Sequence, residues 1–232
     1  MSLHIREASP ADESIVSRIC LLTADAGKSS EALFKNPELP GKSSEALFKN
    51  PELPGLVYAV PYLHLATAWR FVLVETNAEG KEQVVGYIVG SSNCRAFEAD
   101  AAENWWPKLQ ARYPKPPESE RDQYTGAELY YLDFLANPHT TGQEVLDVYP
   151  ALLHINILPA HQGKGWGTKM IRRAVEQVLS DGQKGLWVGI DSRNDNGRKF
   201  YKAIGFERIE SKEGEYYALD AQKFLDSGRG RD

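Results

Sequence analysis

The segment Gln162-Gly163-Lys164-Gly165-Trp166-Gly167 carries three glycines within five residues. The apolar residues 151–158 before it predict a strand. Residues 165–180 after it predict a helix, because Ile171, Ala174, Val175 and Val178 recur on one face. Glycines between a strand and a helix let the backbone approach a diphosphate, and the first N–H groups of the helix carry partial positive charge. The segment therefore predicts a phosphate-binding turn, with an ordinary tight turn as the alternative.

The spacing of these glycines differs from that of two common nucleotide sites. A dinucleotide site needs G-x-G-x-x-G, and a phosphate loop ends in Gly-Lys followed by Ser or Thr. Here Lys164 is followed by Gly165, and the third glycine comes only two residues later. A nicotinamide or ATP site is therefore disfavoured.

The C-terminal elements continue the alternation of strands and helices. Residues 185–191 predict a strand, and residues 196–204 predict a helix that ends at Gly205. Residues 207–210 and 216–219 predict a final hairpin, and the tail from Lys223 to Asp232 has the composition of a frayed terminus.

The N-terminal part predicts a second series of elements. Residues 3–8 predict a strand, and Pro10 opens a helix that carries Ile15, Val16, Ile19 and Leu22. Residues 55–66 predict a helix broken at Pro61, and residues 70–76 and 83–91 predict an antiparallel hairpin.

Residues 93–148 are turn-rich but aromatic, which predicts an ordered insertion with one or two helices. Trp105 and Trp106 in this insertion could line a groove, but adjacent tryptophans more often anchor an insertion to a core, and we favour that role.

Composition and charge limit the class of protein. The chain has 232 residues, of which 42% are hydrophobic and 25% charged, and this predicts a single globular domain. The formal net charge of −5 argues against a nucleic-acid partner but is compatible with an amine. No apolar run approaches the ~20 residues of a membrane span and no signal peptide is evident, so we expect a cytoplasmic protein with no membrane partner. Cys20 and Cys94 are interpreted as structural thiols, and no metal site is expected.

Two blocks of the C-terminal third resemble the acetyl-CoA signature of the GNAT acetyltransferase superfamily. Ile157-Leu158-Pro159-Ala160-His161-Gln162-Gly163-Lys164-Gly165-Trp166-Gly167 is similar to the family's strand, Gln/Arg-x-x-Gly-x-Gly/Ala turn and helix start. Asn194-Asp195-Asn196-Gly197-Arg198-Lys199-Phe200-Tyr201-Lys202-Ala203-Ile204-Gly205-Phe206 is similar to its second block, although Gly197 stands where alanine is usual. That glycine should weaken the start of the helix by up to ~1 kcal/mol.

A closer resemblance extends over nearly the whole chain, to the acetyltransferase-like domain that accompanies O-GlcNAc hydrolases and to its free-standing relatives. It rests on four runs: Ile19-Cys20-Leu21-Leu22-Thr23-Ala24-Asp25-Ala26-Gly27, Ala59-Val60-Pro61-Tyr62, Trp105-Trp106-Pro107-Lys108-Leu109-Gln110 with Tyr113-Pro114, and His154-Ile155-Asn156-Ile157-Leu158-Pro159. In such domains the fold can also serve as a non-catalytic binding module, and that alternative stays open.

The resemblance implies an α+β GNAT fold. It has a mixed, mostly antiparallel twisted sheet of about seven strands, helices on both faces and a long insertion between strands 3 and 4. Residues 1–232 form one domain in this interpretation, and residues 151–206 form the acetyl-CoA-binding core. The implied partners are acetyl-CoA and an amine-bearing small molecule, peptide or protein, and a homodimer is compatible with them.

The resemblance also implies the site residues. The residues implied to bind acetyl-CoA are Ile155, Ile157, Gln162, Gly163, Lys164, Gly165, Trp166, Gly167, Thr168, Asn194, Lys199 and Tyr201. The backbone N–H of Ile157 is implied to hold the thioester oxygen. The phenol of Tyr201 is implied to protonate the departing thiolate, which its ordinary pKa of about 10 permits. The alternative role for Tyr201 is packing on an amphipathic helix.

The general base is not identified by the sequence. Many relatives carry Glu or His four or six residues before the Ile157 position, where this chain has Leu153 and Ala151. His154 has the opposite parity along the strand and should face the other side of the sheet, unless a bulge shifts the strand's register. His154 and Asp191 are therefore candidate bases, with Asp25 as a further alternative.

A 14-residue segment, GKSSEALFKNPELP, occurs twice in tandem at residues 27–40 and 41–54. Two identical copies do not make a repeat architecture, which needs three or more units. The apolar residues 19–22 and 57–60 on either side are predicted to lie in the hydrophobic core. Only one copy is therefore expected to be part of the folded domain.

We expect that deleting residues 41–54 leaves the fold and the acetyl-CoA affinity intact, with a melting temperature within a few degrees of the parent. The deletion recreates the local sequence Leu-Pro-Gly-Leu at the junction. The superfluous copy has at most Leu33 and Phe34, or Leu47 and Phe48, to bury. Burial of two side chains contributes only a few kcal/mol against the entropy cost of ordering the segment. Thermal melting and calorimetry test this, and a deletion variant that aggregates or melts far lower would show that both copies are structural.

Overall fold

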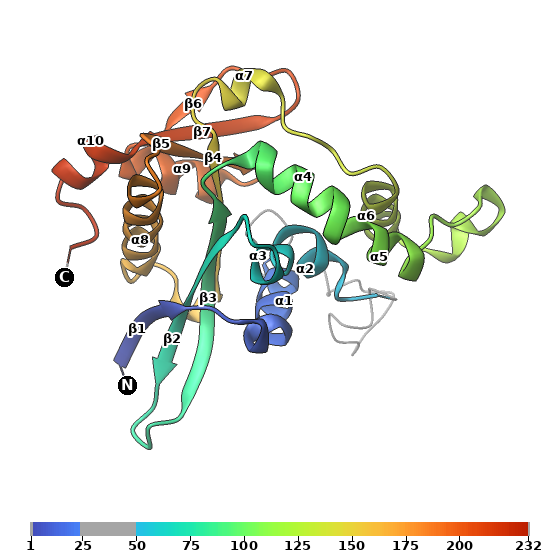
Figure 1. Ribbon diagram of the computed structural model, residues 1–232. Helices are drawn as coiled ribbons and strands as arrows, with labels where there is room; N and C mark the ends of the chain where they lie inside the picture. The colour runs from blue at the N-terminus through green and yellow to red at the C-terminus, as the bar shows by residue number, and fades with distance from the viewer. Residues whose placement is uncertain (1, 24–49, 232) are drawn as a thin grey trace.

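The computed structural model describes residues 2–23 and 50–231. A mixed seven-stranded sheet runs through these residues in the order β1-β2-β3-β4-β5-β7-β6 (Figure 1). Every neighbouring pair is antiparallel except β4 with β5, which confirms the predicted sheet. The strands are β1 Ser2–Glu7, β2 Trp69–Thr76, β3 Glu82–Ser91, β4 Ala151–Ile157, β5 Gly185–Ile190, β6 Glu207–Ile209 and β7 Glu215–Asp220.

Helices cover both faces of the sheet. On one face lie α8 (Trp166–Ser180), α9 (Asp195–Ile204) and α10 (Ala221–Asp226), and on the other lie α1 (Glu13–Leu22), α2 (Leu53–Tyr58), α3 (Pro61–His64) and α4 (Cys94–Asn104) (Figure 1). Side chains alternate along β2 accordingly. Phe71 and Leu73 pack in the α8 core, whereas Val72 and Val74 pack with α1.

Short-range contacts fix the turn between β2 and β3 as predicted. The side-chain oxygen of Asn77 accepts hydrogen bonds from the N–H groups of Glu79 (3.0 Å) and Lys81 (2.9 Å). Gly80 takes a φ of 80°, the left-handed region that favours glycine. Hydrogen bonds and a glycine within the turn itself therefore stabilise the hairpin.

The insertion at residues 93–148 is more helical than predicted. Beside α4 it contains α5 (Trp106–Arg112), α6 (Gly126–Ala136) and α7 (Gln143–Leu146). The start of α6 is a reciprocal cap, in which Thr125 Oγ1 accepts from the Glu128 N–H at 3.2 Å and the Glu128 carboxylate accepts from the Thr125 N–H at 3.0 Å. These helices were not predicted individually because prolines and polar residues interrupt the apolar pattern of the segment.

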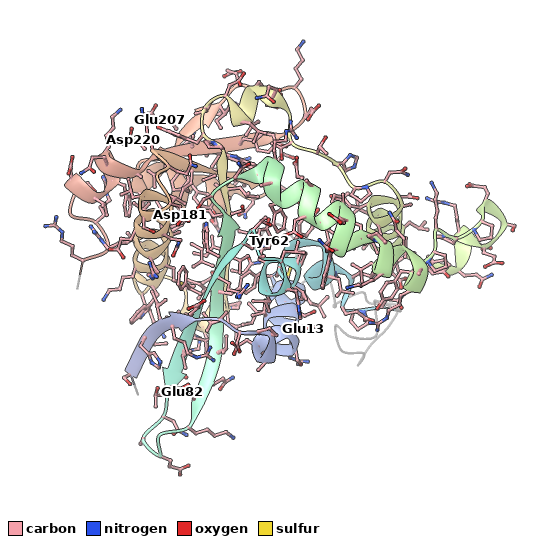
Figure 2. The ribbon with its side chains drawn as sticks, viewed as in Figure 1. Glu13, Tyr62, Glu82, Asp181, Glu207 and Asp220 are labelled. Carbon is pink, nitrogen blue, oxygen red and sulfur yellow. The ribbon has the colours of Figure 1, made fainter. Side chains whose placement is uncertain are left out.

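Aromatic contacts attach the insertion to the rest of the molecule. Trp105 Nε1 donates to the Leu56 carbonyl at 3.0 Å, which confirms the anchoring role for this tryptophan. Tyr62 of α3, labelled in Figure 2, stacks on Phe97 of α4 with centroids 4.3 Å apart. The insertion is therefore held to α2 through Trp105, which lies between α4 and α5, and to α3 through the ring of Phe97.

The prediction of a frayed C-terminal tail is wrong. Asp220 caps α10 by accepting from the Lys223 N–H at 2.9 Å, and Phe224 is 2% exposed in the α8 core. Beyond the helix, Arg172 Nε donates to the Arg229 carbonyl at 2.8 Å. The tail is ordered because Phe224 adds apolar contact to α8, which outweighs its polar composition.

Several expectations concern residues that the structure describes only in part. The first copy of the 14-residue duplication, most of the second copy and Asp25 lie outside the described residues. The end of the second copy begins α2, where Leu53 and Pro54 are buried. Within residues 2–23 and 50–231, no helix has the length and hydropathy needed to cross a bilayer.

Cys20 and Cys94 are both buried, and burial raises the pKa of each thiol to about 12. Neither is a thiolate at neutral pH, in line with a structural role.

Candidate active site

The glycine-rich turn owes its glycines to two different constraints. Gly163 and Gly165 have φ values of 70° and 82°, and a Cβ at either position would meet nothing within 4 Å. Their requirement is therefore conformational. Gly167 is different, because a Cβ there would lie 3.0 Å from Cζ of Phe200. The third glycine thus allows α8 to pack closely against α9.

The hydrogen bonds of the turn limit where an anion could bind. The N–H groups of Gln162 and Thr168 already donate, to Pro159 at 3.2 Å and to Gly165 at 3.1 Å. The N–H groups of Trp166 and Gly167 lie in the first turn of α8, where a helix offers no acceptor of its own. The dipole of this 15-residue helix adds positive charge at the same end. An anion would therefore meet the backbone between Gly163 and Gly167.

The side chain of Gln162 joins this turn to β4. Its Nε2 donates to the carbonyl oxygen of Ile157 at 2.7 Å. The turn is thus held directly beside the end of the strand.

Strands β4 and β5 separate soon after they begin. Their pairing is limited to Ala151 with Leu186 and Leu152 with Trp187. The Leu158 N–H donates to Val85 on β3 at 2.9 Å, and hydrogen-bonding directions alternate along an antiparallel strand. The N–H groups of Ile155 and Ile157 therefore point away from β3, into the opening beside β5.

The opening leads into a cleft of about 1180 Å³. Its walls come from β4, from the end of β5 and the loop after it, from α2 and from the insertion. The cleft brings together five predicted site residues: His154, Ile155, Asp191, Asn194 and Tyr201. Ile157, the residues from Gln162 to Thr168 and Lys199 are not among its lining residues. The predicted site therefore has two parts, a cleft and a turn, joined by the end of β4.

Tyr201 on α9 has a buried ring and an accessible hydroxyl. The side chain is 8% exposed and packs edge-on against Phe200 and Phe206, with centroids 5.2 and 5.1 Å away. Within the described part of the chain its hydroxyl has no hydrogen-bond partner, and the residue lines the cleft. Burial raises the pKa of Tyr201, so the phenol keeps its proton at neutral pH.

His154 faces the cleft as a neutral imidazole. Its Nδ1 lies 2.8 Å from the Tyr58 carbonyl and must donate to it, which leaves the lone pair on Nε2. The Asn156 amide lies 3.4 Å from Nε2, a long contact. Burial lowers the pKa of His154 to about 4. The ring is therefore uncharged at neutral pH and has one nitrogen available as an acceptor.

The register of β4 agrees with the parity argument. Pairing of β3 with β4 shows no shift, and the irregularity lies instead in the β2–β3 pair, between Leu73 and Val74. Leu153 and Ala151 are 3% and 0% exposed in the α8 core. His154 accordingly points to the opposite face.

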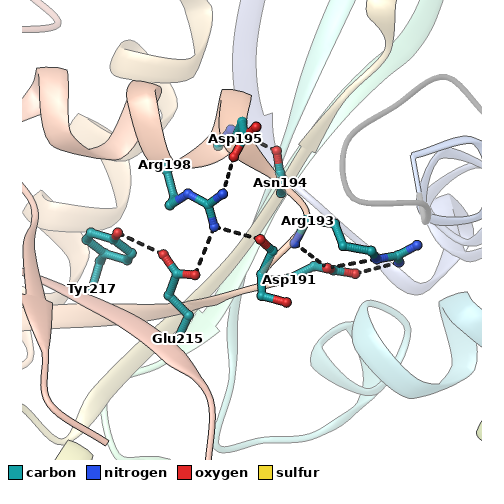
Figure 3. Close-up of polar contacts among 9 residues, drawn as sticks. Asp191, Arg193, Asn194, Asp195, Arg198, Glu215 and Tyr217 are labelled. Atoms are coloured by element: carbon teal, nitrogen blue, oxygen red, sulfur yellow. Dashed lines mark hydrogen bonds and ion pairs between the residues drawn. The ribbon is translucent and has the colours of Figure 1, made fainter.

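Asp191 is tied to the loop that follows β5 (Figure 3). Its carboxylate accepts from the side chain of Arg193 at 2.7 and 3.1 Å and from the Arg193 backbone N–H at 2.8 Å. Hydrogen bonding to the Arg193 side chain, the largest cause, lowers the pKa of Asp191. Asp191 is therefore a weaker base than its position suggested.

Arg198 fastens the same loop to β7. Its Nη1 donates to the Ser192 carbonyl at 2.7 Å and to Glu215 at 2.9 Å, and its Nη2 contacts Asp195 (Figure 3). Glu215 also accepts from the Tyr217 hydroxyl at 2.8 Å. The loop that forms one wall of the cleft is thus fixed by an ion-pair network.

Asn194 caps α9, and this cap explains Gly197. The Asn194 side-chain oxygen accepts from the Gly197 N–H at 2.8 Å. A Cβ at position 197 would lie 2.8 Å from Asn194 Nδ2, so alanine would displace the capping amide. Glycine at position 197 therefore lowers helix propensity, as predicted, but keeps the Asn194 cap, which stabilises the helix by roughly 1 kcal/mol. Lys199 is exposed on the same helix.

The sequence revealed little of the aromatic part of the cleft, which five rings line: Tyr58, Trp106, Tyr130, Tyr131 and Phe134. Trp106 lines the cleft, so the favoured anchoring role holds for Trp105 and the groove alternative holds for Trp106. No motif singled out the other four rings. The pair Tyr130-Tyr131 with Phe134 three residues later was the available signal, because such spacing places rings on adjacent turns of one helix.

Comparisons with known proteins agree with this fold. The sequence profile described as the acetyltransferase (GNAT) family matches residues 50–206, more than half of the chain. The crystal structure of SsHAT superposes with a TM-score of 0.70 at 29% identity, covering 95% of this chain and 99% of that one. A structure of a mutant AtaT toxin, bound to the C-terminus of the antitoxin AtaR and acetyl-CoA, superposes with a TM-score of 0.51 at 15% identity and covers 98% and 99% of the two chains.

Curated relatives match over shorter stretches. They include the thialysine N-epsilon-acetyltransferase of Mus musculus (29% identity, 44% of this chain and 55% of that protein) and the L-amino acid N-acyltransferase MnaT of Escherichia coli (26%, 56% and 71%). The [ribosomal protein bS18]-alanine N-acetyltransferase of Haemophilus influenzae matches at 32% over 32% of this chain and 49% of that protein. The chain thus spans about half the length of the mouse and Haemophilus relatives.

We expect the imidazole of His154 to stay neutral down to about pH 5. Its folded pKa of about 4 lies below the ordinary value of 6.5, so acidification between these values protonates the unfolded chain but not the folded one. Above pH 6.5 the ring is neutral in both states and does not lower the free energy of unfolding. As the pH falls toward 4, protonation of the unfolded chain lowers the free energy of unfolding by about 3 kcal/mol. NMR titration of the ring, with His154→Gln to assign its signals, measures the pKa directly. A midpoint near 6.5 would contradict the buried, neutral ring.

Proposed function

Because the chain belongs to the acetyltransferase (GNAT) family, we propose that it transfers the acetyl group of acetyl-CoA to an amine by direct attack. One observation carries the proposal. The backbone edge of β4 at Ile155 and Ile157 opens beside β5 and is joined by Gln162 to the glycine turn at the start of α8. A ligand with amides along its chain and a diphosphate at its end matches this arrangement.

The chain offers two sets of groups to acetyl-CoA in this proposal. The backbone of Ile155 would pair with an amide of the pantetheine arm, as an added strand does, and the N–H of Ile157 would stay available for the acetyl oxygen. The N–H groups from Gly163 to Gly167 would receive the diphosphate, and Lys164, Thr168 and Lys199 would add polar contacts at the exposed end. Asn194 would contribute through its position at the cleft, since its oxygen already caps α9.

Acetyl-CoA supplies an activated acetyl thioester, in which the carbon–sulfur bond breaks as the carbon–nitrogen bond forms. The Ile157 N–H donates to the acetyl oxygen, which gains negative charge during attack. Tyr201 gives its phenolic proton to the leaving sulfur, and its raised pKa keeps that proton available at neutral pH. The amine nitrogen loses one proton to water as the amide forms, and one proton from water restores the Tyr201 phenol, so the products are the amide and the CoA thiol.

Of the candidate bases within the described residues, His154 and Asp191, we favour His154. Its Nε2 keeps a lone pair facing the cleft, whereas both carboxylate oxygens of Asp191 are bonded to Arg193. A pKa of about 4 makes His154 a weak base, so it would act on an amine through water or orient one that has already lost its proton to solvent. The alternative of a non-catalytic module is not favoured, because an accessible phenol lies in the cleft and the curated relatives are named as N-acyltransferases. The closer likeness to the domain that accompanies O-GlcNAc hydrolases stays a proposal supported by the four sequence runs.

We expect Gly165→Glu to weaken acetyl-CoA binding at least tenfold while the fold persists. A carboxylate at the start of α8 would repel the diphosphate, and the position itself has open space. The matched control is Gly182→Glu, at the other end of α8, where φ is 80° and nothing lies within 4 Å. It imposes the same backbone strain away from the turn. Calorimetric titration with acetyl-CoA compares the two, and equal affinities would refute the placement of the diphosphate.

We expect Tyr201→Phe to lower kcat by roughly 10²-fold or more while the affinity for acetyl-CoA stays nearly unchanged. Only the proton donor is removed, and proton transfer contributes about 10²–10⁴ to such reactions. Tyr149→Phe, which removes a phenol outside the cleft, is the control. Thiol release with an amine panel gives the rates. Equal rates for Tyr201→Phe and the parent would return Tyr201 to a packing role.

A further inference from the structure

The part of the cleft beyond His154 has an aromatic wall, formed by Tyr58, Trp106, Tyr130, Tyr131 and Phe134. The rings touch in sequence. Tyr58 lies 5.9 Å from the His154 ring and 6.1 Å from Phe134, and Trp106 meets Phe134 edge-on at 5.9 Å. The wall therefore leads from the candidate reaction site to the helices of the insertion.

Two of the wall's few polar atoms are paired with each other. The hydroxyl of Tyr58 lies 2.8 Å from that of Tyr130, which is 54% exposed at the rim. Tyr131 and Phe134 offer ring surface, and Tyr131 is 8% exposed. Such a surface favours an apolar or aromatic ligand body, which gains contact area without losing hydrogen bonds.

The cleft's carboxylates are each matched by an arginine. In the described part of the chain they are three: Glu98, Asp191 and Glu215. Their nearest guanidinium distances are 2.6 Å to Arg95, 2.7 Å to Arg193 and 2.9 Å to Arg198. Glu98 also accepts from the Thr141 N–H at 2.7 Å. Among the described residues, a second ammonium group of a bound ligand would therefore lose its hydration in the cleft without gaining an unpaired carboxylate.

From these two features we infer that the acceptor is a primary monoamine carried on an aromatic body, not a polyamine. The inference rests on the proposed function and names the substrate class of the same site. The amine lies beside His154 and Tyr201, and the aromatic body lies along the wall of Tyr58, Trp106 and Phe134. The insertion at residues 93–148 thereby determines the specificity of the enzyme.

The test compares 2-phenylethylamine, ethylamine and spermidine on the full-length protein. Equilibrium binding is measured by calorimetry in the presence of CoA, and kcat/KM is measured by thiol release with acetyl-CoA. We expect 2-phenylethylamine to bind at least tenfold more tightly than spermidine and to give the highest kcat/KM. Phe134→Ala should lower both values for 2-phenylethylamine about tenfold and leave ethylamine unchanged.

Two further variants separate recognition from folding. Phe134→Leu keeps apolar volume and should lose less than Phe134→Ala. Tyr124→Ala removes a ring that packs on the same cluster of the insertion but does not line the cleft, and it should leave binding of all three amines unchanged. Spermidine that binds as tightly as 2-phenylethylamine, or equal losses in Phe134→Ala and Tyr124→Ala, would overturn the inference.

The same data distinguish failure of the inference from failure of the proposed function. Turnover of spermidine in preference to 2-phenylethylamine would leave acetyl transfer standing and reject the aromatic acceptor. Ring-dependent binding without thiol release from any amine would support the aromatic site and reject catalysis.

Discussion

The early separation of β4 from β5 is the constraint on which the rest of the structure depends. The two strands share two residue pairs, after which β4 continues against β3 and β5 continues against β7. Each strand keeps its outer partner and presents an open inner edge. Backbone groups away from water need partners, so this edge favours a ligand that brings its own amides. The sheet remains one unit because α8 and β7 contribute to a core cluster shared by both halves.

The charged residues of the loop between β5 and α9 hold the wall of the cleft in place and have no chemical step assigned to them. Arg198 joins the Ser192 carbonyl to Glu215 on β7, and Arg193 closes on Asp191 (Figure 3). Glu215 is largely buried, with a side chain 14% exposed, so the Arg198 pair offsets its desolvation. Within the described residues, each of the three carboxylates of the cleft is thus paired with an arginine.

The insertion supplies most of that ring surface, and the N-terminal helices hold it in place. Trp105 bonds to α2, and Tyr62 of α3 stacks on Phe97. Leu53 and Leu56 of α2 share a core cluster with Leu132 and Leu135 of α6. The part of the wall that the insertion supplies therefore rests on contacts with α2 and α3.

Local signals in the sequence determined the elements and their order. Period-two apolar runs, the Asn77–Gly80 turn, the glycines at the start of α8 and Gly205 after α9 act over a few residues, and each was predictable from neighbours in the chain. The parity of β4 likewise placed His154 opposite Leu153, because side chains alternate along any strand.

Only the tertiary structure decided what each residue meets. It showed that Gly167 makes room for Phe200, that Gly197 makes room for the Asn194 cap and that Phe224 orders the tail. It also lowered the pKa values of His154 and Asp191 and assembled the aromatic wall. These outcomes depend on burial and on contacts between segments as far apart as Tyr58 and His154. A sequence pattern read over one or two turns carries no information about such distances.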